Sequence, residues 1–188
     1  MSQQALLTRI VDALDGAGIP YMLTGSLASS LQGGPRATHD MDLVIDIAVG
    51  DVARVMRALS SPEVYLDEHA VSDATRRRTM FNLVDSSSGD KADFWLLTDE
   101  PFDRERFARR LRVEALGLEL SVSAPEDTIL MKLRWSARAG GSEKQLGDAL
   151  RVYELQAGSL DEGYLDLWAL RLEVAAALAA IRKQARAG

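Results

Sequence analysis

The residues of this chain best suited to chemistry are two small residues followed by two acidic ones. Gly25-Ser26 ends one apolar stretch, and Asp40-Met41-Asp42 opens the next after thirteen intervening residues. A Gly-Ser pair between a strand and a helix presents backbone N–H groups that favour phosphate. Two acids on one face of a strand offer oxygen ligands to a divalent metal ion. The combination suits a nucleoside triphosphate held through metal, and indicates an enzyme that transfers nucleotidyl groups.

The spacing of the acid pair fits chemistry with two metal ions. Asp40 and Asp42 alternate with Met41, so on a strand their side chains share a face at about 6–7 Å. Paired divalent ions in phosphoryl-transfer sites lie roughly 3.5–4 Å apart, so each carboxylate can reach one ion or both. Without metal the two charges repel by about 2–3 kcal/mol at an effective dielectric constant near 20. Hard oxygen ligands favour Mg²⁺ or Mn²⁺.

Each of these residues also has a plainer interpretation. Acids are common on the outer face of a half-buried strand, and Asp46 continues the same row without an evident role. Ser26 can serve as an ordinary helix cap. Asp93 precedes the apolar stretch 94–97: it can complete a carboxylate cluster from a neighbouring strand, or it can be a surface residue at a strand end.

Composition describes a globular protein of ordinary type. The chain has 188 residues, 47% of them apolar and 27% charged, which is enough for one domain with a core. Its net charge is −6, with 8 basic and 15 acidic residues in 1–100 against 14 and 13 in 101–188. Such an acidic first half suits a basic partner better than it suits non-specific binding of nucleic acid. Cysteine is absent, which excludes disulfides and thiolate metal sites. With no membrane-length apolar run and no signal peptide, the expected location is the cytoplasm.

Hydrophobic periodicity predicts an α+β fold. Residues 1–123 are expected to form an α/β core with a small mixed sheet flanked by helices, and residues 124–188 a helical region packed on that core. The expected strands are 19–24, 41–47, 80–85, 91–97, 112–116 and 118–123. The expected helices are 3–15, 26–31 capped by Ser26, 52–59, 107–111, 125–138 capped by Ser123, 142–157, 161–170 and 173–185. Aromatic residues of the helical region are expected to pack between helices, with base stacking as the alternative: Trp135, Tyr153, Tyr164 and Trp168.

The pattern Gly25-Ser26, Asp40-x-Asp42 and a later Asp93 resembles the nucleotidyltransferase superfamily that includes DNA polymerase β. The closer likeness is to its AbiEii-like branch of prokaryotic nucleotidyltransferases and toxin–antitoxin enzymes. Segment 36–43, RATHDMDL, resembles the R-x-[ST]-x-D-[ILM]-D-[LF] stretch of that branch. Segments 124–133 and 142–148 resemble its "spEDlilmKL" and "sekQ-x-x-D" stretches, so that the likeness covers about residues 16–172.

The resemblance implies roles for the motif residues. Asp40, Asp42 and Asp93 would hold Mg²⁺ or Mn²⁺, with Asp93 also helping to deprotonate the acceptor hydroxyl. Gly25 and Ser26 would contact the β- and γ-phosphates of the NTP. The acceptor oxygen would then attack the α-phosphate and pyrophosphate would leave.

Three further residues are implied as contacts of the nucleotide. Lys132 would bind phosphate or nucleotide, although it can equally be an ordinary lysine of an amphipathic helix. Asp148 would act behind Lys132 or near the base. Arg36 would either touch phosphate or pin its loop to nearby acids.

Three functions compete at this level. The first is an active nucleotidyltransferase that modifies an RNA 3′ end, a protein side chain or a small molecule, within or outside a toxin–antitoxin system with a cognate protein partner. The second is a non-catalytic module that binds a nucleotide or a partner, as an antitoxin does. The third is a purely structural domain, which leaves the acid cluster as coincidence.

Overall fold

A mixed sheet forms the centre of the protein. The computed structural model describes residues 2–34 and 40–186, with the backbone alone at Asp40. Its strands are β1 (Tyr21–Thr24), β2 (Asp40–Ile45), β3 (Val64–Tyr65), β4 (Met80–Asp85), β5 (Lys91–Leu96), β6 (Leu111–Ala115) and β7 (Leu118–Val122). They lie in the order β3-β4-β5-β2-β1-β7-β6, with the pairs β2–β5 and β1–β7 parallel and the others antiparallel.

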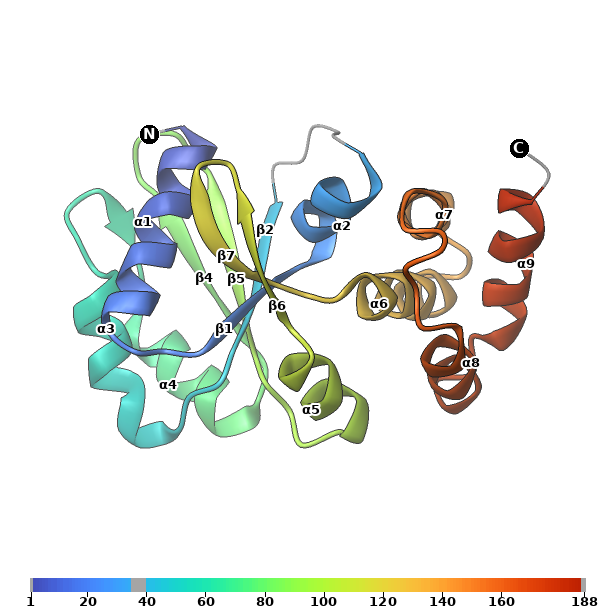
Figure 1. The fold of residues 1–188 in the computed structure, drawn as a ribbon. Helices are drawn as coiled ribbons and strands as arrows, with labels where there is room; N and C mark the ends of the chain where they lie inside the picture. The colour runs from blue at the N-terminus through green and yellow to red at the C-terminus, as the bar shows by residue number, and fades with distance from the viewer. Residues whose placement is uncertain (1, 35–39, 187–188) are drawn as a thin grey trace.

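Helices lie on both sides of this sheet and beyond one end of it (Figure 1). They are α1 (Gln3–Gly16), α2 (Gly25–Gly33), α3 (Val52–Leu59), α4 (Glu68–Arg77), α5 (Pro101–Ala108), α6 (Pro125–Arg138), α7 (Glu143–Leu155), α8 (Glu162–Arg171) and α9 (Ala175–Ala185), with a short 3-10 turn, η1 (Val49–Asp51), before α3. The predicted α+β class is confirmed. Within the described residues, no helix is long and apolar enough to cross a membrane.

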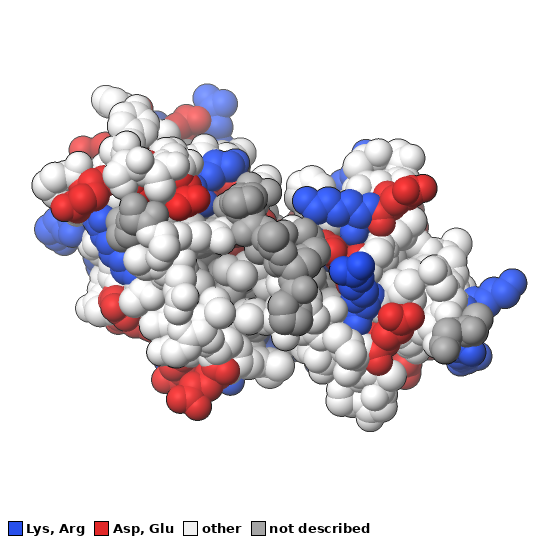
Figure 2. Space-filling view, turned by 90° about the horizontal axis from the view of Figure 1, so that it is seen from above, with Lys and Arg blue, Asp and Glu red and all other residues white. Residues whose placement is uncertain are grey.

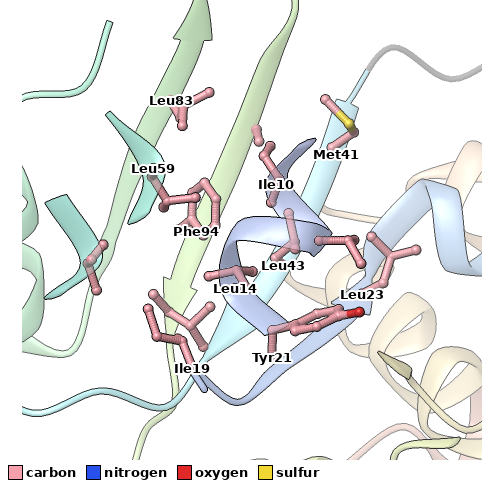
Figure 3. Packing of buried hydrophobic residues seen from close by; sticks show 14 of the residues in the cluster. Ile10, Leu14, Ile19, Tyr21, Leu23, Met41, Leu43, Leu59, Leu83 and Phe94 are labelled. Atoms are coloured by element: carbon pink, nitrogen blue, oxygen red, sulfur yellow. The ribbon is translucent and has the colours of Figure 1, made fainter. Parts of the chain in front are cut away.

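One face of the sheet is covered by α1, α3 and α4. Ile10 and Leu14 of α1 pack with Leu43 of β2 and Phe94 of β5 in a single buried cluster (Figure 3). Alternation along β2 explains this, because Met41, Leu43 and Ile45 belong to the cluster whereas the residues between them face the other way. The predicted period-two pattern is therefore confirmed, and it leaves the opposite face of β2 for the side chains discussed below.

A second hydrophobic cluster belongs to the helices that follow the sheet. Leu130 and Leu133 of α6, Val152 of α7 and Trp168 of α8 pack together there, joined by Phe102 of α5. The predicted helices 125–138, 142–157, 161–170 and 173–185 correspond to α6 to α9. The predicted β4–β5 and β6–β7 hairpins are also confirmed.

Several local predictions were wrong. Residues 107–111 are not a helix: α5 ends at Ala108, and Leu111 already begins β6. Ser26 does not cap α2, since the helix begins at Gly25 and Thr24 takes the capping position. Ser123 likewise precedes the capping position of α6, which Ala124 occupies. Helix α2 thus begins one residue earlier than predicted, whereas the extended backbone before α6 continues one residue past Ser123.

Strand β3 and helix α4 were not foreseen. Asp67 caps α4 by accepting hydrogen bonds from the backbone N–H groups of His69 and Ala70, at 2.7 and 3.3 Å. Only a narrow apolar stripe, with Val71 and Ala74 buried, faces the sheet. The run Arg76–Arg78 that ends this helix therefore lies at a helix terminus, where cations are favoured by the helix dipole.

A buried polar network joins α6 and α8 to the chain after α5. Asp127 is fully buried and accepts a hydrogen bond of 2.6 Å from the Tyr164 hydroxyl. The Arg109 Nε lies 3.5 Å from the other carboxylate oxygen, and the Arg109 guanidinium stacks over the Tyr164 ring. Burial raises the pKa of Asp127 to about 6, against the pull of Tyr164 and Arg109. The same burial raises the pKa of Tyr164.

The raised pKa predicts an unusual dependence of stability on pH. Because Asp127 titrates near 3.8 when unfolded and near 6 when folded, the folded state holds its proton more tightly, and the stabilisation is lost as pH rises through 6. We expect the difference in unfolding free energy between Asp127→Asn and wild type to shift by up to about 3 kcal/mol in favour of the variant from pH 4 to pH 7. Urea unfolding at both pH values measures it. Asp12→Asn, at an exposed position of α1, should show no such shift, and a flat difference for Asp127→Asn would contradict the assignment.

Candidate active site

Four polar side chains form one row across adjacent strands. Asp42 on β2 pairs in register with Thr24 on β1 and with Asp93 on β5, and Asp93 pairs with Asn82 on β4. Residues in register point to the same face of a sheet, and neighbouring strands lie about 4.8 Å apart. Asp42 and Asp93, which are far apart in the sequence, are thus direct neighbours on the face opposite the α1 cluster.

Gly25 leaves room for the Asp42 carboxylate. Its backbone has φ +64°, in the left-handed region that favours glycine. A Cβ atom at this position would lie 2.1 Å from Asp42 Oδ2. The start of α2 therefore lies directly against the carboxylate, and any other residue would displace one or the other. Helix N-termini favour anions, and the carboxylate of Asp42 lies at this one.

Neighbouring side chains hold both carboxylates in place. The Trp95 indole N–H donates to Asp42 Oδ1 at 3.2 Å. Asp93 accepts a hydrogen bond from the Asn82 side-chain amide, and its other oxygen lies 3.2 Å from the Lys91 ammonium. Such partners fix the orientation of carboxylates that ligate metals.

Lys132 connects three elements at the site. It is buried, with only 4% of its surface exposed, and its ammonium lies 2.8 Å from Asp148 on α7 and 3.5 Å from the Ser26 hydroxyl on α2. An ordinary lysine of an amphipathic helix extends into solvent, whereas Lys132 is enclosed by α2 and α7; its contact with a nucleotide stays a prediction. Of the predicted nucleotide contacts, Ser26, Lys132 and Asp148 are brought together by the tertiary structure.

A cavity of about 470 Å³ opens between the sheet face and α6. Thr24, Gly25, Ser26 and Asp42 line it on one side and Lys132 on the other. Its size lies within the range of small-molecule sites. Asp93 lies beside Asp42 in the same row but is not among the residues that line the cavity.

The donor set fits a hard divalent cation in part. Asp42 and Asp93 supply carboxylate oxygens on adjacent strands, and the cradle at Gly25 leaves space around one of them. Among the side chains that the structure describes, no three His, Asp or Glu residues gather as a metal site. The Asp40 carboxylate lies outside the described side chains, as do all atoms of Arg36, so the predicted roles of both stay predictions.

Several residues that line the cavity were not singled out from the sequence. They include Thr98, Arg134, Arg138 and Lys144. On α6 the residues that line the cavity are 128, 131, 132, 134, 135 and 138. Most of them are three or four residues apart, which is the spacing of residues on one face of a helix. A polar and aromatic stripe opposite the apolar stripe of α6 was the signal that could have found Arg134 and Arg138.

Trp135 corrects one of the packing predictions. Trp168 is buried between helices as expected, but 41% of Trp135 is exposed, and Trp135 lines the cavity. Its ring centroid lies 6.1 Å from that of Trp95 at a tilt of 58°. An exposed indole at a cavity wall suits stacking against a planar ligand, which was the alternative interpretation.

Comparisons with known proteins agree on the fold. No protein-family model matches the sequence, and no curated protein is significantly similar to it. Among solved structures, the crystal structure of ANT(2")-Ia in complex with adenylyl-2"-tobramycin is similar at TM-score 0.57 and 14% identity, over 98% of this chain and 99% of that one. The solution structure of antibiotic-resistance factor ANT(2'')-Ia is similar at TM-score 0.53 and 14% identity, over 99% and 98%.

The chain therefore has the fold of nucleotidyltransferases over nearly its whole length. The predicted fold is confirmed. At this level of identity the likeness extends to the fold alone, and the function must be argued from the side chains.

Proposed function

We propose that the protein is a metal-dependent nucleotidyltransferase that moves an NMP from an NTP to an acceptor hydroxyl. One observation carries the proposal: Asp42 lies against the N-terminus of α2 in a cavity that Lys132 also lines, and Asp93 is its register neighbour on β5. Carboxylates, helix N–H groups and a buried ammonium are together what a triphosphate needs. A purely structural role does not explain why the backbone at Gly25 lies so close to the Asp42 carboxylate.

Each residue has a defined task in this proposal. Asp42 and Asp93, together with Asp40, are the groups that would hold Mg²⁺ or Mn²⁺, which when bound neutralises charge on the phosphates. Gly25 and Ser26 bind the β- and γ-phosphates through the first turn of α2. Lys132 binds phosphate while Asp148 fixes its position, and Asp93 accepts the proton of the acceptor hydroxyl. Together these groups accelerate transfer by holding the acceptor hydroxyl and the α-phosphate in the geometry of the reaction.

The acceptor class can be narrowed by analogy. The neighbour whose complex contains adenylyl-2"-tobramycin suggests an acceptor that is a small molecule with a hydroxyl group. The resemblance of segments 36–43, 124–133 and 142–148 to the AbiEii-like branch keeps an RNA 3′ end or a protein in a toxin–antitoxin system as the other candidates.

An isotope experiment tests the proposal. The protein is incubated with Mg²⁺ and a pool of small molecules and RNA, with NTPs labelled at either the α- or the γ-phosphate. Transfer of a nucleotidyl group puts the α-label into a new product and releases the γ-label as pyrophosphate. Removing metal with EDTA should stop both, and added Mn²⁺ should restore them. Appearance of the γ-label in the product, or transfer that persists without metal, would contradict the proposed reaction.

A further inference from the structure

A second cavity lies beside the candidate active site. It has a volume of about 390 Å³ and is lined by Arg134, Ala137 and Arg138 of α6 and by residues 171–174, where α8 passes into α9. Figure 1 shows α6 between the sheet and the last two helices. Because Arg134 and Arg138 line both cavities, a ligand in one is within reach of a ligand in the other.

The wall of this second cavity carries more positive than negative charge. Three arginines face a single acid, Glu173. Arg134 is paired with Glu100 at 2.9 Å. Within the described part of the chain, Arg138 and Arg171 have no ion-pair partner; the Arg171 guanidinium lies over the Trp168 ring, 5.0 Å from its centroid. Two guanidinium groups are thus available to an anion.

This local excess contrasts with the protein as a whole, whose net charge is −6. On the face that Figure 2 shows, acidic and basic side chains are interspersed over both parts of the molecule. The second cavity therefore differs from the protein as a whole, because its lining has more arginines than acids. Such a site repels cations and concentrates anions.

Arginine in a cavity favours phosphate in particular. Its planar fork of N–H donors matches phosphate oxygens in a bidentate contact. The backbone supports the position of Arg171, because the turn after α8 closes with the Val174 N–H donating to the Ala169 carbonyl at 2.8 Å. Glu173 takes the left-handed conformation of that turn at φ 61°. The turn therefore fixes the backbone next to Arg171.

We propose that this second cavity binds a phosphate group carried by the acceptor substrate. The inference rests on the proposed function and names the acceptor class: a small molecule with both a hydroxyl and a phosphate. Arg138 follows Lys132 by six residues on α6, which places it about 9 Å further along the helix. An acceptor held by Arg138 and Arg171 therefore projects its hydroxyl back toward the triphosphate at Lys132. A polycationic acceptor is excluded by the same charges.

Binding of matched probes tests this without turnover. Glycerol 3-phosphate, inorganic phosphate, neutral glycerol and cationic spermine are titrated into ¹⁵N-labelled protein. We expect both phosphates to shift amides of residues 171–174, with the ester binding at least as tightly as the free ion, and glycerol and spermine to leave them unchanged. Arg171→Gln and Arg138→Gln should each weaken ester binding about tenfold. Arg57→Gln, on the exposed side of α3, is the control and should bind as wild type does.

A competition arm separates this inference from the proposed function. Ester binding should persist when a nonhydrolysable NTP with Mg²⁺ saturates the first cavity, and it should persist in Asp42→Asn. If the NTP displaces the ester, the arginines belong to the nucleotide, and the inference fails. If Arg171→Gln binds the ester as tightly as wild type, the inference fails as well. If the NTP does not bind but the arginine variants still lose the ester, the second site stands and the proposed function fails.

Discussion

The Asp42→Asn variant is expected to lose nucleotidyl transfer by about 10³-fold or more while remaining folded. Asparagine keeps the size of the side chain and one oxygen for the Trp95 indole N–H, but it removes the charge that holds metal beside Asp93. Loss of one preorganised electrostatic group in an active site costs about 10²–10³-fold, and loss of a metal ligand at least as much. The α-label transfer assay measures the rate of nucleotidyl transfer. Calorimetric titration with Mn²⁺ measures the affinity of the variant for the metal ion.

Asp46→Asn is the matched control for this prediction. Asp46 lies just beyond the end of β2 and makes a solvent-exposed ion pair with Arg104, which contributes little, so its variant should transfer at the wild-type rate. Gly25→Ala should reproduce the loss by another route, because the new Cβ would press on Asp42 Oδ2. If Asp42→Asn transferred label as fast as Asp46→Asn, the site assigned here would be wrong.

The Lys132→Met variant is expected to lose about 3–5 kcal/mol of unfolding free energy. Methionine fills a similar volume, but it leaves the carboxylate of Asp148 in a buried position without the ammonium that lies 2.8 Å from it. Breaking one side of a buried ion pair costs this much because the remaining charge is desolvated. For a chain of this size the midpoint of thermal unfolding should fall by roughly 10 °C. Urea and thermal unfolding measure both quantities.

Two further variants make the Lys132 prediction specific. Lys144→Met removes another lysine from the same cavity wall, but an exposed one, and should change the unfolding free energy by about 0.5 kcal/mol at most. Lys132→Met combined with Asp148→Leu should regain much of the lost stability, since it removes both charges of the buried pair. A double variant no more stable than Lys132→Met would show that the stability does not depend on the pair.

The sequence alone determined the elements whose pattern is local. Period-two alternation in 41–47 predicted which face of β2 is buried, and Asp42 lies on the other face as expected. The five-residue loop 86–90 predicted the β4–β5 hairpin, and an early proline with acids in the first turn predicted the start of α6 at Pro125. These features depend on residues within one strand or one helical turn, so neighbouring side chains are sufficient to specify them.

Tertiary structure alone decided which distant residues meet. The parallel register of β2 and β5 brings Asp93 to Asp42, and the packing of α6 on α2 and α7 buries Lys132 between Ser26 and Asp148. The arginines and Trp135 of α6 acquire their cavity in the same way. Register between strands that do not follow one another, and the face that a helix turns to its neighbours, are set by the packing of the whole core. No short stretch of sequence contains that information.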